Sequence, residues 1–306
     1  MSRRLHPTRR HAPPNSRAAI AIAAATVLFL PPPPAPRKAS ALGLHPLAAV
    51  TTQSSDTLTP LQRQIETQSR RLASVDVEER RDAVVSLGAL RRPEASRAAG
   101  AALGDRSAVV RAHATRAVLS LAPADGAALL APVLLRDRDE FVRRESAYAL
   151  GLARAGAAVP ALVNALERDK QASVRGAAAV ALGQIGDPVA VSVLARKLSE
   201  RIPSTGLLSR VTRGKREEDE FVRRAAAVSL GQIGDRAAAP ALIDTLSKER
   251  SEDDVRREAA RALGLIGDPA AIPALRAALN ARDPHLSRIA QEALRKLSLG
   301  VPSPFM

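Results

Sequence analysis

The chain has 306 residues, of which 2% are aromatic, and it contains no Cys and no Trp. This composition disfavours a core of large side chains, excludes a disulfide framework and a thiol nucleophile, and, with its abundant Ala, favours closely packed short helices in an all-α protein. The formal net charge is +15, but residues 1–50 hold seven basic and no acidic side chains and leave only +8 on the rest, which weakens a nucleic-acid-binding interpretation.

The first 41 residues have the organisation of a targeting signal. Five Arg residues precede an apolar run over residues 18–30, and four Pro residues and the sequence Ala39-Ser40-Ala41 follow. The run suits the apolar region of a signal peptide and is too short to span a bilayer. We therefore expect residues 1–41 to direct export to the periplasm or the exterior, leaving no membrane span after removal. An organellar transit peptide, also Arg-rich and free of acidic residues, is the alternative.

Residues 42–58 are predicted to form a flexible linker, after which a first helix begins. Thr59 followed by Pro60 is typical of an N-cap with Pro at the first helical position. The pattern predicts a helix to about Ala73, which would cover the open end of the structure that follows.

An internal repeat occupies most of the remaining sequence. The dipeptide Val-Arg recurs at intervals of 32, 32, 48 and 33 residues, and Leu-Gly follows eight residues after each of the last four Val residues. The Val residues are Val110, Val142, Val174, Val222 and Val255. Apolar or small residues at steps 0, 4, 8 and 11 predict one amphipathic helix per unit, and an Ala- and Leu-rich segment predicts a second. Such short helix pairs cannot bury their apolar stripes alone, so they are expected to stack.

Residues between the helices support these boundaries. Gly-Asp-Pro, as at 186–188, ends one helix with Gly and opens the next with Pro. An Asp closes the second helix of several units, as at Asp105, Asp137 and Asp169. The longest interval exceeds the others by about 16 residues, so residues 202–218, rich in Gly, Ser, Arg and Lys, are predicted to be an exposed and mobile insertion loop.

The units resemble HEAT-like repeats, of the kind first described in phycobilin lyase subunits, over about residues 76–300. The resemblance rests on Pro-Ala-Leu-x-x-Ala-Leu, a following Asp, and Val-Arg-x-x-Ala-Ala-x-Ala-Leu-Gly-x-Ile-Gly. It implies an α-solenoid (superhelix) of about six HEAT-like helix pairs over residues 59–300, with short capping helices, the second at 284–298, and a tail at 301–306. The same repeat occurs in lyases, hydroxylases and scaffolds, so it does not by itself select a function.

Residues that could carry chemistry are sparse. Asp and Arg recur six residues apart in three units, but their regular repetition favours a structural ladder that links adjacent loops. HEAT-like hydroxylases use His-Glu pairs, whereas none of the five His residues here is followed by Glu, and only His113 and His285 lie in repeats. Because no P-loop, dinucleotide motif or Ser-His-Asp set occurs either, we predict no catalytic, cofactor-binding or metal-binding residue.

These observations predict a non-catalytic scaffold that binds a protein or peptide, and not nucleic acid, through its concave face. Positions two, three and six residues after each Val are expected to point away from the stack and to line that face. The candidate contact residues are His113, Arg116, Arg144, Tyr148, Arg224, Arg257 and Arg261. Tyr148 is the expected anchor, because Tyr is enriched at interface hot spots. A bilin-lyase-like subunit and a nucleic-acid-binding HEAT-like protein are the open alternatives.

Overall fold

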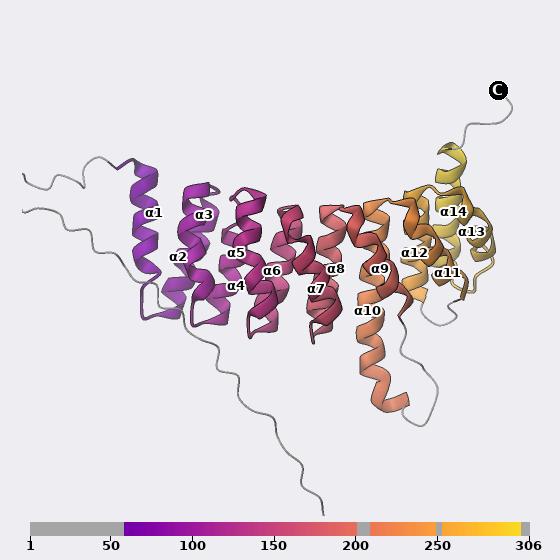
Figure 1. Ribbon diagram of the computed structural model, residues 1–306, viewed down its shortest axis with the longest axis horizontal. Helices are drawn as coiled ribbons and strands as arrows, with labels where there is room; N and C mark the ends of the chain where they lie inside the picture. Colours follow the sequence, from indigo (N-terminus) through magenta and orange to yellow (C-terminus); the bar gives the residue numbers. More distant parts are fainter. Residues whose placement is uncertain (1–57, 201–208, 249–252, 301–306) are drawn as a thin grey trace, which may run out of the picture. The chain divides into compact units, whose positions relative to one another are not determined.

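The computed structural model describes residues 58–200, 209–248 and 253–300, and within these ranges the chain forms α-helices, short 3-10 helices and turns (Figure 1). The predicted leader, almost all of the predicted linker and the tail lie outside the described residues. The α-helices are α1 (Pro60–Arg71), α2 (Val77–Ala89), α3 (Pro93–Gly100), α4 (Ala108–Ala117), α5 (Pro123–Arg136), α6 (Glu140–Leu152), α7 (Val159–Arg168), α8 (Ala172–Ile185), α9 (Val191–Ser199), α10 (Ser209–Ile233), α11 (Ala239–Lys248), α12 (Asp253–Ile266), α13 (Ile272–Ala278) and α14 (Pro284–Gly300). The all-α prediction is confirmed.

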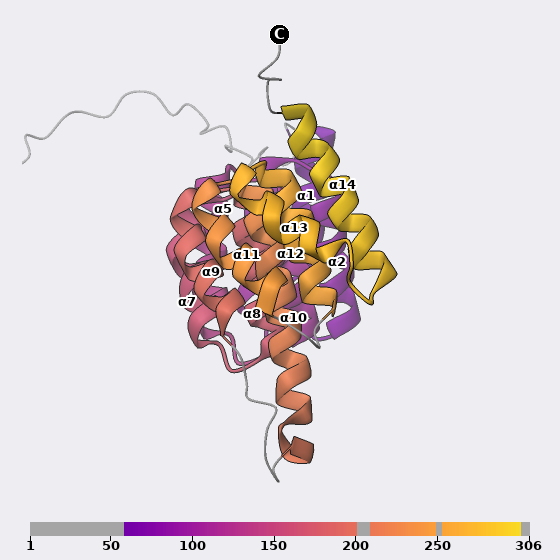
Figure 2. The ribbon, with the colours of Figure 1, turned by 90° about the vertical axis from the view of Figure 1, so that its right-hand side faces the viewer.

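The helices alternate between two layers of a stack. The even-numbered helices contact one another in order from α2 to α14, and those from α4 to α12 carry the Val-Arg pairs. From α5 onward, each odd-numbered helix packs mainly against the even-numbered helix that follows it, whereas α3 packs against both α2 and α4. The helices α5, α7 and α9 lie on the side opposite α2 and α14 (Figure 2). The solenoid is confirmed with one refinement. The predicted capping helices α1 and α14 each complete a pair, because α1 packs against α2 and α13 packs against α14.

Local sequence signals account for the helix ends. Thr59 forms the predicted N-cap of α1, in a capping box in which its Oγ1 accepts from the backbone of Gln62 and the Gln62 side chain accepts from the backbone of Thr59. Asp139 caps α6, because its side chain accepts hydrogen bonds from the backbone N–H groups of Phe141 and Val142. These side chains satisfy backbone donors that have no partner within the helix.

A left-handed residue ends several even-numbered helices. Gly186, Gly234 and Gly267 adopt φ angles of 73–79° at the same repeat position, as the Gly-Asp-Pro pattern predicted for the first and last. Arg91 and Arg154 occupy this position after α2 and α6, with φ angles of 50° and 48°. Gly adopts this backbone without the steric cost that a Cβ atom brings, so these two Arg residues are conformationally strained.

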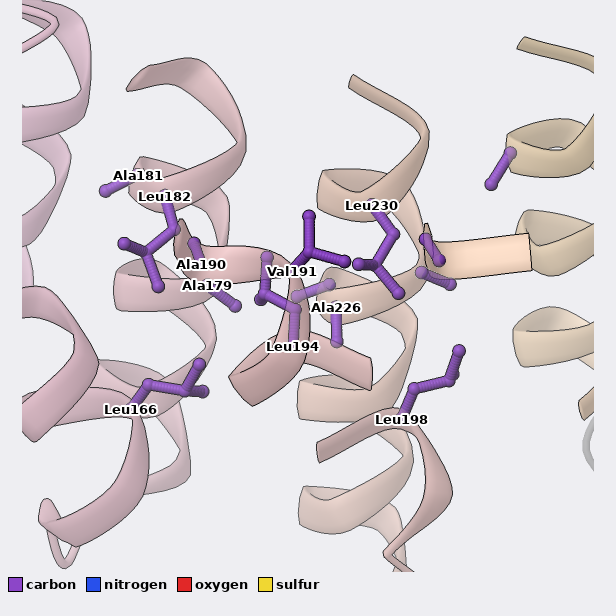
Figure 3. Packing of buried hydrophobic residues seen from close by; sticks show 14 of the residues in the cluster. Leu166, Ala179, Ala181, Leu182, Ala190, Val191, Leu194, Leu198, Ala226 and Leu230 are labelled. Carbon is purple, nitrogen blue, oxygen red and sulfur yellow. The ribbon is translucent and has the colours of Figure 1, made fainter. Parts of the chain in front are cut away.

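Leu and Ala build the core between the layers. Leu182 of α8, Val191 and Leu194 of α9, and Leu230 of α10 point into the shared space between these helices, and all four are buried (Figure 3). Leu166 of α7, in the Ala- and Leu-rich segment of its unit, is also fully buried. Ala fills the closely spaced positions, so burial comes from many small contacts rather than from a few large side chains.

The Gly of each Leu-Gly pair lies where two even-numbered helices approach. A Cβ atom on Gly151 of α6 would lie 2.7 Å from Cα and 2.9 Å from Cβ of Ala181 in α8, and Gly231 of α10 lies similarly close to Ala262 of α12. Odd-numbered helices contact one another less extensively. The more tightly spaced, even-numbered layer is therefore the inner side of the curved stack.

The predicted insertion loop is partly helical, which corrects that prediction. The helix α10 begins at Ser209, so residues 209–218 extend the Val-Arg helix of that unit, and α10 projects beyond its neighbours in Figure 1. Residues 202–208 lie outside the described residues. The extension forms because lengthening an existing helix costs far less than nucleating one, and because Arg, Lys and Glu are good helix formers.

Candidate partner-binding surface

Four positions of each Val-Arg helix lie on the open side of the even-numbered layer. Counted from the Val, they are −1, +2, +6 and +10, and their spacing of three or four residues puts them on one face of the helix. We call this set the inner face. In the middle of the stack it consists of Val109, Ala112, Arg116 and Ser120; Phe141, Arg144, Tyr148 and Leu152; Ser173, Gly176, Val180 and Gln184; and Phe221, Arg224, Val228 and Gln232.

The inner face of α6 presents large apolar side chains to solvent. Phe141 is 43% and Leu152 62% exposed, and the half-buried ring of Tyr148 packs against the core between them. The guanidinium carbon of Arg144 lies 4.7 Å from the centroid of the Phe141 ring. This cation–π distance is short enough to hold the Arg144 side chain over the ring. The helix therefore offers an ordered patch of aromatic, aliphatic and cationic groups.

A related patch lies on α10. The ring of Phe221 packs across to α8, where a Cβ atom on Gly176 would overlap the ring edge. Arg224 lies 6.0 Å from the centroid of the same ring, and its Nη1 is 3.5 Å from Oδ2 of Asp254 in α12. The absence of a side chain at Gly176 thus makes room for an aromatic ring that joins two repeats and stays 37% exposed.

A buried carboxylate lies beneath the inner face between α4 and α6. The Glu145 side chain is 9% exposed, and its Oε2 accepts a hydrogen bond from Nε of Arg116 at 3.1 Å and forms an ion pair with Nη2 of the same side chain at 2.9 Å. Nε of Arg144 lies 3.7 Å from Oε1 of the same group. Two Arg side chains thus compensate one buried charge and leave a net positive surface above it.

The structure places six of the seven predicted contact residues on the inner face. These are Arg144, Arg224 and Arg257 at +2, and Arg116, Tyr148 and Arg261 at +6. The prediction for +3 was wrong, because this position turns toward the neighbouring even-numbered helix. There His113 is half-buried, with Nδ1 2.8 Å from the carbonyl oxygen of Val109, and Glu145 is buried. The role of the seven residues in binding stays a prediction.

Several exposed apolar residues were missed. Phe141 at −1, and Leu152 and Leu265 at +10, belong to the inner face and are 37% or more exposed. The +10 position lies one helical turn beyond +6 and so on the same face of the helix. The spacing of four residues from Tyr148 to Leu152, or from Arg261 to Leu265, could therefore have predicted these two residues from the sequence.

Arg–Asp pairs join consecutive repeats at one edge of the stack. In three junctions, Nε and Nη2 of an Arg donate to the two carboxylate oxygens of an Asp in the next repeat, at 2.7–3.0 Å. Two of these Arg residues belong to Val-Arg pairs, and the third, Arg80, takes the same place in the first unit, after Glu79. The pairs are Arg80–Asp105, Arg111–Asp137 and Arg143–Asp169. The six-residue spacing in the sequence corresponds to a different bond: Nη1 of Arg111, for example, donates to the backbone carbonyl of Asp105 at 2.9 Å. The predicted ladder exists, with each carboxylate held by the preceding repeat.

The ladder lowers the pKa of its carboxyl groups. The hydrogen bond from Arg80 holds the pKa of Asp105 below its usual value. Burial raises the pKa of Asp137 and Asp169, but hydrogen bonds from Arg111 and Arg143 and from backbone N–H groups more than offset it, so each pKa is also lowered. All three Asp residues are therefore ionised in the folded protein at neutral pH.

A groove of about 750 Å³ opens beside this ladder, between the end of α5 and the start of α8. Charged side chains such as Arg138, Glu140, Arg168 and Lys170 line most of it, with Leu134 and Leu135 as its apolar part. No aromatic side chain lines this groove, so it lacks the surface that a large conjugated ligand requires.

The helices of the described residues include none that is both long and apolar enough to cross a bilayer. Within the same residues, no three His, Cys, Asp or Glu side chains come together in a group that could hold a metal ion.

Comparisons with known proteins agree with this architecture. Residues 127–204 and 245–302 match the family model for HEAT repeats, and residues 222–248 match that for the PBS lyase HEAT-like repeat. No curated protein matches the sequence. The X-ray structure of YIBA from Escherichia coli is similar, with 22% identity, a TM-score of 0.51, and coverage of 78% of this chain and 82% of that one. The likeness shows the fold.

Two further solved structures are more distant. The complex of CpcE and CpcF of phycocyanin lyase from Nostoc sp. PCC7120 has 23% identity and a TM-score of 0.44, covering 84% of this chain and 94% of that one. Human deoxyhypusine hydroxylase in complex with glycerol has 22% identity and a TM-score of 0.37, covering 78% and 96%.

Proposed function

The chain belongs to the HEAT-repeat proteins, and from that premise we propose that it is a non-catalytic scaffold that binds a segment of a protein partner along its inner face. The observation that carries the proposal is the patch on α6, where Phe141, Tyr148 and Leu152 expose apolar surface beside Arg144. A partner with apolar side chains would bury this surface, and acidic side chains would meet the neighbouring Arg residues.

The rigidity of the inner face supports the same proposal. Its side chains stand on helices that touch where Gly meets Ala, as at Gly151 and Ala181. Ordered side chains lose less conformational entropy on binding, so a preorganised surface binds more tightly than a mobile one of equal area. No feature of the charged groove favours the alternative of a bilin-lyase-like subunit.

Site-specific photo-crosslinking tests which face binds. We would place p-benzoylphenylalanine at position 148 on the inner face or, as a matched control, at position 129, where Leu129 of α5 is exposed on the other layer. After irradiation in an extract of the source organism, we expect a discrete crosslinked product from position 148 alone. Crosslinking from position 129 alone would contradict the proposal.

Affinity measurements with the crosslinked partner then test the residues. Tyr148→Ala is expected to cost about 2 kcal/mol of binding free energy, or about thirtyfold in affinity. Arg116→Ala and Arg261→Ala should cost less and show stronger salt dependence, because exposed charges act through screened electrostatics. Leu150→Ala, a fully buried position, is the control that should lower stability by about 2–5 kcal/mol. Wild-type affinity in all three surface variants would refute binding through the inner face.

We also propose that the N-terminal segment directs export. The proposal rests on the Arg-rich start, the apolar run and the Ala39-Ser40-Ala41 sequence. N-terminal sequencing of the native protein should then begin near Leu42. Recovery of an intact Met1 or Ser2 terminus would contradict it.

A further inference from the structure

Each rung of the Arg–Asp ladder is an Arg of one repeat and the Asp of the next repeat that it binds. We call a rung closed where this pair forms, and open at Arg175, where the described residues supply no Asp. In each closed rung the guanidinium is oriented by carbonyl groups of its own repeat. Nη1 of Arg143 donates to the backbone oxygen of Asp137 at 3.0 Å, and Nη1 of Arg80 donates to two such oxygens at 3.0 and 3.1 Å. This leaves Nε and Nη2 aimed at the next repeat, where they bind both oxygens of an Asp carboxylate.

The backbone around the Asp fixes the position of its carboxylate in two of the closed rungs. Asp137 and Asp169 are the C-caps of α5 and α7, with φ and ψ of −61° and 136°, and −65° and 139°. Each also accepts a hydrogen bond from the N–H two residues ahead, at 2.9 Å in both cases. The carboxylate is therefore fixed before the Arg reaches it, and the pair forms with little further ordering.

At the junction of α8 and α10 the Arg is oriented as in the closed rungs, but the part of the chain that the structure describes places no carboxylate against it. Nη1 of Arg175 donates to the backbone oxygens of Asp169 and Lys170 at 3.0 and 3.1 Å, as in the closed rungs. Among the described residues, no carboxylate contacts its guanidinium.

The residue at the expected C-cap position is Glu200 instead of Asp. Its backbone angles of −67° and 132° match those of Asp169. The longer Glu side chain turns instead to Lys197, whose Nζ lies 2.7 Å from its Oε2.

We propose that Arg175 is a carboxylate-binding site for an acidic side chain of a protein partner. The half-buried guanidinium presents Nε and Nη2 in the geometry that binds Asp in three neighbouring repeats. Such parallel N–H···O bonds to a planar carboxylate are strong and directional, and here the donor is already oriented. The site lies at the ladder edge of the stack, apart from the inner face, so it does not depend on the proposed function.

The chemistry at this position favours a carboxylate over a phosphate. In the closed rungs, Nε and Nη2 of the Arg bind the two oxygens of one planar Asp carboxylate at 2.7–3.0 Å. A planar carboxylate fits this pair of donors in the arrangement that the fold already uses three times. The site is therefore assigned to a protein carboxylate, and competition by an oligonucleotide tests the assignment.

A labelled octa-aspartate peptide is a direct probe, measured by fluorescence polarisation with the protein spanning all repeats. We expect Arg175→Ala to weaken binding about tenfold or more, because two charge-assisted hydrogen bonds are lost. The matched control is Arg168→Ala, an exposed Arg at the end of α7. It should change affinity by no more than about twofold, since a solvated charge contributes little.

Glu200→Asp tests the same idea from inside the protein. Aspartate at this C-cap should reach the Arg175 guanidinium, close the rung, raise the melting temperature and weaken peptide binding as much as Arg175→Ala does. The proposal would be overturned if wild type failed to bind the peptide, if Arg175→Ala and Arg168→Ala lost affinity equally, or if Glu200→Asp bound it as tightly as wild type. Equal competition by an octathymidylate would overturn the assignment to a protein partner. Tyr148→Ala should leave peptide binding unchanged, which separates this site from the inner face.

Discussion

Substitution of Gly151 by Ala is expected to destabilise the protein although Ala is the better helix former. Gly151 lies inside α6, and its added Cβ would stand 2.7 Å from Cα of Ala181 and would overlap the Gln184 side chain. Both Ala181 and Gln184 belong to α8, and a backbone carbon cannot move aside without shifting that helix. The substitution therefore forces two repeats apart.

The magnitude follows from two opposed effects. Overpacking costs about 1–3 kcal/mol, and replacing Gly by Ala within a helix returns up to about 1 kcal/mol. We expect a net loss of about 1–2 kcal/mol, which corresponds to a fall of about 2–8 °C in melting temperature for a chain of this size. Urea unfolding followed by circular dichroism would measure the free energy of unfolding directly.

Gly126→Ala is the matched control. Gly126 also lies inside a helix, α5, but a Cβ atom there would have no heavy atom within 4 Å. Only the difference in helix propensity remains, so this variant should gain about 0.5–1 kcal/mol. The double variant Gly151→Ala/Ala181→Gly should recover part of the loss, because it removes the Ala181 Cβ atom at 2.9 Å but leaves the backbone carbon at 2.7 Å in place. If Gly151→Ala proved as stable as Gly126→Ala, close helix approach would not explain the Leu-Gly motif.

Three further predictions concern stability. Asp137→Asn should lower the free energy of unfolding in urea by about 3–5 kcal/mol, since it leaves a buried guanidinium without its carboxylate. Arg154→Gly should raise it by about 1 kcal/mol, and Gly186→Ala should lower it by a similar amount, because both positions have positive φ. A hydrogen bond from the guanidinium of Arg257 in α12 lowers the pKa of Asp283 to about 2. The ionised Asp283 therefore contributes fully to stability above about pH 4, and this contribution is lost as the pH falls toward 2. Asp283→Asn should remove this part of the pH dependence of the urea midpoint.

The opposite result in each experiment would contradict one assumption behind these predictions. Wild-type stability of Asp137→Asn would mean that the ladder does not join the repeats. A destabilised Arg154→Gly would mean that the Arg side chain contributes more than its backbone strain costs. An acid transition unaltered in Asp283→Asn would place the loss of stability at other carboxylates.

Local patterns in the sequence determined the helices of this protein. The apolar steps from each Val placed the even-numbered helices, and Thr59-Pro60 placed the start of α1. Gly186 and Asp169 marked helix ends as expected. Such signals act within about one or two helical turns, so they are legible without knowledge of the rest of the chain. The repeated spacing then determined that these helices stack.

Only the tertiary structure decided which groups from different repeats meet. Arg111 is six residues from Asp105 in sequence, yet its carboxylate partner is Asp137, because stacking brings the end of the next odd-numbered helix to the guanidinium. The same stacking buries Glu145. The open rung at Arg175 depends on one methylene group of a residue 25 positions later, Glu200. Contacts of this kind depend on the separation and rotation of neighbouring repeats, which no local pattern encodes.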